Sequence, residues 1–194
     1  MADLLDDLAG VAPGSPLDAL RARRAAAREH TEASFRALFH PAESGPVAPR
    51  ERFAVGLYVA LLHEDGALAE RFEGWLADAA LAALVREAAA ATAAPGPSGA
   101  YPPGPLSRES TPAPRFAPPE GAAAALGPRL LAALAHAHFL VLHPRDAAPE
   151  RLDALRAAGW DADGVVTLSQ IVSFLAYLTR AAAGLRALQE AGPA

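Results

Sequence analysis

The chain has 194 residues, which is long enough for one domain with a buried core. Its 17 basic and 22 acidic side chains give a formal net charge of -5, and no cluster of Lys and Arg alternates with aromatic residues, so we expect no nucleic-acid partner. The absence of cysteine excludes disulfides, thiolate nucleophiles and cysteine metal ligands within this chain.

The N-terminal sequence MADLLDDLAGVAPGSPLDAL carries acids where a signal peptide needs basic residues. No apolar run approaches the roughly 18 residues of a membrane span. We therefore expect a cytoplasmic protein with no membrane partner.

Helical signals fill the N-terminal half of the chain. Ser15 followed by Pro16 predicts the N-cap and first turn of a helix that runs to about Leu38. After the breaker HPAESGP, Pro49 opens a second helix, RERFAVGLYVALLH, which is apolar enough to be well buried. Asp65 is the predicted N-cap of a third helix. The inward stripe of that helix is predicted to comprise Leu68, Phe72, Trp75, Leu76 and Ala79.

The segment 92–121 is too rich in proline for a helix or a central strand. We expect it to cross the surface in extended form, with Tyr101, Leu106 and Phe116 as apolar anchors.

The C-terminal part again reads as helical. Helices are predicted over about 122–142, over about 149–158 with Gly159 as the C-cap, and from Asp161 or Asp163 to about Gln189. No strand pattern of useful length occurs, so the predicted class is all-α. We expect a single domain over 1–194, in which helical halves at 1–91 and 122–194 are joined by the proline-rich segment at 92–121.

Three histidines lie close together near the end of the helix at 122–142. His136 and His143 are two turns apart, whereas metal sites normally use closer spacing together with a carboxylate. We therefore predict no metal site, and we interpret His138, which is in line with Leu134, as a core or interface residue.

Two stretches carry a family resemblance. The C-terminal order of HPRD, LDALRAAGW, an acidic cap and SQIVSFLAYLTRAAAGL resembles the alkylhydroperoxidase-D-like and carboxymuconolactone decarboxylase (CMD domain) family, particularly its peroxidase-related branch. The segment PRERFAVGLYVALLHEDGALAERFEGW is similar to the first core helix pair of that family. The resemblance covers roughly half of the chain. It implies an alkylhydroperoxidase-D-like helical bundle that assembles as a homo-oligomer.

The chain departs from the family at the reactive motif. Peroxidatic members carry Glu-x-x-Cys-x-x-Cys-x-x-x-His, and the corresponding residues here, to within about one position, are Leu62, Asp65, Leu68 and Phe72. A cysteine-based peroxidase cycle is therefore not expected from this chain alone. Only a cysteine-bearing relative of the same family, acting as a partner subunit, would supply the thiols. Asp65 places a fixed negative charge at the helix N-terminus, which favours a structural cap over a general base.

Two groups of residues are candidates for chemistry. His63 lies beside Asp65 where the family's active site would be, so either residue is a candidate proton carrier; the alternative for His63 is a partly exposed histidine at a helix end. Ser173, Tyr177 and Arg180 share one helical face with Gln170 and are candidate ligand-binding residues. Arg180 suits a carboxylate ligand, and its alternative is an ion pair with Glu51, Glu64 or Asp65.

Two functions from different classes remain open. The first is a non-redox subunit or binder of a small organic ligand that has lost the cysteine pair. The second is a decarboxylase-type or isomerase-type enzyme without a cofactor, which acts on a small organic acid or lactone. A purely structural oligomer is the third interpretation, expected if no cavity reaches the helix junction.

Overall fold

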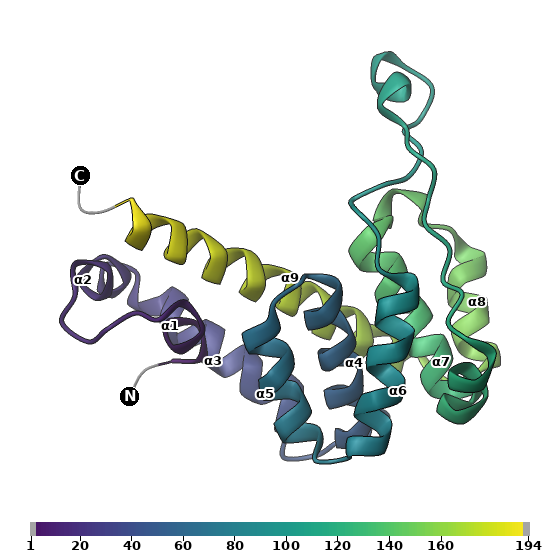
Figure 1. Ribbon diagram of the computed structural model, residues 1–194, viewed down its shortest axis with the longest axis horizontal. Helices are drawn as coiled ribbons and strands as arrows, with labels where there is room; N and C mark the ends of the chain where they lie inside the picture. The colour runs from purple at the N-terminus through teal and green to yellow at the C-terminus, as the bar shows by residue number, and fades with distance from the viewer. Residues whose placement is uncertain (1–2, 192–194) are drawn as a thin grey trace.

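The computed structural model describes residues 3–191, and these residues form an all-α fold (Figure 1). The prediction of the all-α class is confirmed. The described residues contain no β-strand, and a single bridge pairs Gly99 with Thr111. The α-helices are α1 (Leu4–Ala9), α2 (Pro16–Ala22), α3 (Ala25–Phe39), α4 (Pro49–Leu62), α5 (Gly66–Leu76), α6 (Ala79–Thr92), α7 (Glu120–Leu142), α8 (Pro149–Ala157) and α9 (Ala162–Glu190). Two short 3-10 helices are η1 (Pro105–Glu109) and η2 (Pro144–Asp146).

Helix α4 forms the centre of the molecule. Every residue from Arg52 to Ala60 is buried, and the helix contacts α5, α6, α7 and α9. A helix that is apolar on all sides needs neighbours on all sides, so the prediction that this segment is well buried is confirmed. The buried guanidinium of Arg52 donates hydrogen bonds to the carbonyls of Val47, Ser44 and Leu38, and it thereby fixes the chain that leads into α4.

Helix α5 lies against α4 through a close approach at one glycine. A Cβ on Gly56 would lie 2.8 Å or less from three ring atoms of Phe72. Phe72 is fully buried, so there is no free space into which its ring could move. The absence of a side chain at Gly56 thus sets the distance between the two helices.

The helix predicted from Ser15 to Leu38 is wrong, because the chain turns at residues 23 and 24. Ser15 caps α2 as predicted, and its hydroxyl accepts a hydrogen bond from the Asp18 amide at 3.1 Å. Arg24 leaves the helical region with φ -123° and ψ 59°, and α3 then starts anew. The turn brings Arg21 of α2 and Arg28 of α3 to the same acidic residues, Asp3 and Asp6. Asp3 is the N-cap of α1 and Asp6 lies within it; this helix was not predicted from the sequence.

A second break separates α5 from α6. Ala77 has φ 50°, which ends α5, and the Asp78 carboxylate then caps α6 by accepting from the Leu81 amide at 3.0 Å. Ala79 therefore belongs to α6. The prediction that it is part of the inward stripe of α5 is wrong.

The proline-rich segment between α6 and α7 does not lie flat on the surface. Its middle projects from the body as a narrow loop (Figure 1). Phe116 is an anchor as predicted, since it packs on the core with its ring centroid 6.3 Å from that of Tyr58. Leu106 is 51% exposed, so its predicted role as an anchor is wrong.

Helices α7 and α9 complete the core beside α4. Asp161 caps α9 by accepting from the Gly164 amide at 2.7 Å. Both helices are long and apolar enough to span a membrane by length and composition, although neither contains an uninterrupted apolar run of that length. The same criteria are met by core helices of soluble proteins, and here α7 and α9 pack against α4 and against each other.

Candidate functional site

The junction of α4 and α5 holds Leu62, Asp65 and Leu68, and Phe72 follows one turn later; these are the positions that the resemblance aligns with the peroxidatic motif. The Asp65 carboxylate accepts a hydrogen bond from the Leu68 amide at 3.1 Å, so its predicted role as an N-cap is confirmed. Its other oxygen lies 3.7 Å from a terminal nitrogen of Arg186. Leu68 and Phe72 are fully buried. These positions therefore form packed core and a helix cap.

A cavity of about 210 Å³ opens next to this junction. It lies between the end of α4, the chain that follows α6, the end of α7 and the middle of α9. Its polar lining includes His63, Glu64 and Arg180. The remaining lining residues are Leu62, Ala94, Pro95, Gly96, Pro97, Val141 and Leu142.

His63 is the C-cap residue of α4 and is half-buried. Burial lowers its pKa, and the positive charge of Arg180 lowers it further, while Asp65 acts in the opposite direction. The imidazole is therefore favoured in its neutral form at neutral pH. Its Nε2 is buried and has no hydrogen-bond partner among residues 3–191.

Arg180 presents its guanidinium at the edge of the same cavity. One terminal nitrogen donates to the Ala176 carbonyl of its own helix at 3.0 Å, and the side chain is exposed. Within the described part of the chain it forms no ion pair: Glu51 is bound by Arg129 at 2.7 Å, Asp65 lies 3.7 Å from Arg186, and Glu64 lines the same cavity without an ion pair to Arg180. The predicted alternative, an ion pair of Arg180 with one of these acids, is therefore not formed.

The other predicted site residues lie outside this cavity. The Tyr177 hydroxyl is 2.8 Å from the Thr31 hydroxyl, and Ser173 donates to the Ser169 carbonyl at 2.8 Å. Both side chains are on the exposed face of α9. The structure thus brings His63 and Arg180 together at the cavity. Ser173 and Tyr177 do not line it, and Asp65 is close enough to His63 to affect its pKa but does not line the cavity either.

One wall of the cavity was not predicted from the sequence. Residues 94–97, at the start of the proline-rich segment, approach the end of α7, where the Ser98 amide donates to the Leu142 carbonyl at 2.6 Å. Gly96 makes this approach possible, since a Cβ there would lie 3.2 Å from the Leu142 carbonyl oxygen. The only signal in the sequence was a glycine among prolines, which is equally typical of a flexible linker.

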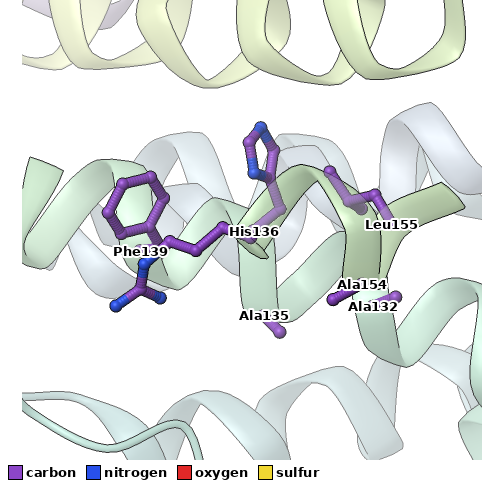
Figure 2. A pocket seen from close by; sticks show the side chains of 7 residues that line it. Ala132, Ala135, His136, Phe139, Ala154 and Leu155 are labelled. Atoms are coloured by element: carbon purple, nitrogen blue, oxygen red, sulfur yellow. The ribbon is translucent and has the colours of Figure 1, made fainter. Parts of the chain in front are cut away.

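A second, smaller cavity of about 120 Å³ lies between α7 and α8 (Figure 2). Figure 2 shows the His136 ring between Phe139 and Leu155. His136 Nε2 is 2.9 Å from the Ser169 hydroxyl, which itself donates to the Val165 carbonyl. Ser169 therefore accepts from His136, and the ring proton is on Nε2. Burial is the largest cause that lowers the pKa of His136 to about 4.

The three histidines of α7 and its C-cap have different polar partners, although the rings of His138 and His143 lie 5.6 Å apart. His138 is fully buried, as predicted, and its Nε2 donates to the Thr92 carbonyl at 3.0 Å. His143 Nδ1 lies 3.3 Å from an Asp146 carboxylate oxygen. In the described ranges no group of three or more metal-binding side chains is arranged around one point.

No family model matches this chain, and no curated protein or solved structure matches it either.

Proposed function

We propose that this chain is a non-redox protein of the alkylhydroperoxidase-D-like class, and that it binds a small organic carboxylate in the cavity between His63 and Arg180. The observation that carries the proposal is their juxtaposition. A guanidinium with no acidic partner among residues 3–191 and a neutral imidazole line one cavity at the helix junction.

The chemistry of the lining favours a short monocarboxylic acid. Arg180 is able to bind both carboxylate oxygens through two parallel N–H donors, and His63 supplies a further hydrogen-bonding group. Leu62, Val141 and Leu142 provide an apolar wall for a short carbon chain. Glu64 carries a negative charge at the same cavity and disfavours a second acidic group on the ligand.

The non-redox part of the proposal is supported by what fills the reactive positions. The chain has no cysteine, and Leu68 and Phe72 are packed core residues that exchange neither protons nor disulfides. In a complex with a cysteine-bearing relative, this chain would contribute ligand binding and the relative would contribute the thiols.

The test is a calorimetric titration with acetate, butyrate, lactate and benzoate. We expect at least one acid to bind, Arg180→Ala to weaken that binding about tenfold or more, and Arg180→Lys to weaken it less. Arg36→Ala is the matched control. It removes an exposed arginine on α3 instead of the one on α9, and the variant should bind the acid as the unchanged chain does. Equal affinity in the Arg180→Ala variant, or no binding of any acid at 10 mM (on the order of -3 kcal/mol, the weakest measurable range), would refute the proposal.

A second candidate is an enzyme without a cofactor that uses His63 as the proton carrier on an organic acid or lactone. The neutral state of His63 favours it, because a general base must be unprotonated at the working pH. Asp65, the other predicted proton carrier, is engaged as a helix cap and lies outside the cavity. His63→Gln separates the two functions: an enzyme loses turnover of a short acid or lactone while it keeps binding, and full retention of turnover excludes His63 as the base.

A further inference from the structure

The proline-rich loop between α6 and α7 carries an uncovered arm, which we define as residues 101–115. Residues 102–113 are all exposed, and the 3-10 helix η1 forms the tip (Figure 1). Leu106 at this tip is 51% exposed. The tip therefore presents one apolar side chain next to the charged side chains of Arg108 and Glu109, away from the body of the molecule.

The base of the arm is held firmly. The backbones of Gly99 and Thr111 exchange two hydrogen bonds of 3.1 and 3.2 Å. The guanidinium of Arg145 stacks 4.2 Å from the ring centroid of Tyr101. Prolines occupy five of the fifteen positions of the arm and fix φ there, so a partner has little backbone entropy to remove.

The same chain carries a second uncovered surface on α9. Its outer stripe, defined as Asp163, Val166, Gln170, Ser173 and Tyr177, follows steps of three and four residues and is exposed along its whole length. Val166 is 55% exposed and Tyr177 is 45% exposed. Because its hydroxyl is 2.8 Å from that of Thr31, the Tyr177 ring is held in place as an open aromatic surface.

We propose that the proline arm of one copy packs on the outer stripe of a second copy, so that two chains form a reciprocal dimer. Proline-rich segments recognise aromatic surfaces, and the stripe offers the Tyr177 ring at one end and Val166 about 16 Å away toward the other end. The charges also match, since Arg108 follows Leu106 on the arm and Asp163 precedes Val166 on the stripe.

The contact has to be made between copies. Both surfaces are exposed in the single chain, so the arm does not cover the stripe of its own copy. Neither Arg108 nor Asp163 has an ion-pair partner within residues 3–191. In a two-fold dimer each contact occurs twice, which doubles the area that one narrow arm buries.

The test is a charge exchange followed by sedimentation velocity. We expect the unchanged chain to dimerise, and Arg108→Asp or Asp163→Arg alone to raise the dimer dissociation constant about tenfold or more, because each places like charges in contact. The double variant restores the pair in reversed order and should return most of the lost affinity. Arg115→Asp, which reverses a charge on the arm away from the tip, is the control and should have a smaller effect.

A second variant tests the arm independently of charge. Replacement of residues 102–113 with a short Gly-Ser link should give a monomer with an unchanged far-UV spectrum, since the arm lies outside the core. A monomeric unchanged chain at 100 µM (an affinity weaker than about -5.5 kcal/mol), a dimer that survives loss of the arm, or a double variant no better than the singles would each overturn the proposal.

Discussion

At the scale of single residues, buried histidines make the stability of this fold depend on pH. Burial lowers the pKa of His136 to about 4 in the folded chain, from an ordinary value near 6.5. The imidazole is neutral in the folded chain, so its contribution to the free energy of unfolding is complete above about pH 6.5. It is lost as the pH falls from there toward 4, because the unfolded chain then binds a proton that the folded chain excludes.

We predict that the free energy of unfolding falls by about 3 kcal/mol between pH 7 and pH 4 through His136 alone. Urea unfolding at half-unit steps of pH measures this slope. The variant His136→Gln should flatten the slope, but not abolish it, because burial also lowers the pKa of His138 and His143. The exposed His30 provides the matched control, and His30→Gln should keep the slope of the unchanged chain. If the free energy of unfolding of His136→Gln had the same pH dependence as that of the unchanged chain, His136 would be protonated without loss of stability.

At the scale of helices, the packing of α5 on α4 depends on Gly56. Gly56→Ala places a methyl group against the ring of the fully buried Phe72, and we expect it to destabilise the fold by about 1–3 kcal/mol. Gly74→Ala, on the exposed side of α5, meets nothing within 4 Å and should be neutral or slightly stabilising, because alanine favours helices. Thermal unfolding of the two variants provides the comparison. Equal melting temperatures would mean that α5 shifts freely on α4.

The same scale shows how far the sequence could predict this fold. Periodicity and caps gave the all-α class, the burial of α4, and the starts of α2 and α5 at Ser15 and Asp65, because these depend on neighbouring residues only. The breaks at Arg24 and Ala77 were missed. Neither position carries the glycine or proline that usually signals a break. The turn at Arg24 instead accompanies the ion pairs of Arg21 and Arg28 with distant acidic residues, and the turn at Ala77 is followed by the Asp78 cap of α6.

The candidate site was predictable to a similar extent. His63 and Arg180 were identified from residue type and position, but their meeting in one cavity depends on how α4 and α9 pack. Spacing on α9 also grouped Arg180 with Ser173 and Tyr177, although only Arg180 lies at the cavity. A shared helical face predicts a shared direction, and it does not predict which neighbour the face meets.

At the scale of the whole molecule, the two ends of the chain are fastened to each other. Helix α1 packs on α9, whose Arg186 donates to the Leu8 carbonyl at 3.0 Å. Arg21 binds Asp3 and Asp6 at 2.7 Å each, and all three side chains are at most 10% exposed. The N-terminal helix therefore depends on a nearly buried cluster of charges and not on its own six residues, which are too few to form a stable helix.

We predict that Arg21→Ala destabilises the molecule by about 2 kcal/mol, because it leaves nearly buried carboxylates with only Arg28 as a partner. The loss should appear first as faster amide exchange in α1 and near the end of α9, while α4 stays protected. Arg36→Ala removes an exposed pair with Glu32 and should cost at most about 0.5 kcal/mol. Unchanged exchange in α1 after the loss of Arg21 would mean that apolar packing of Leu5 and Leu8 alone holds the chain ends together.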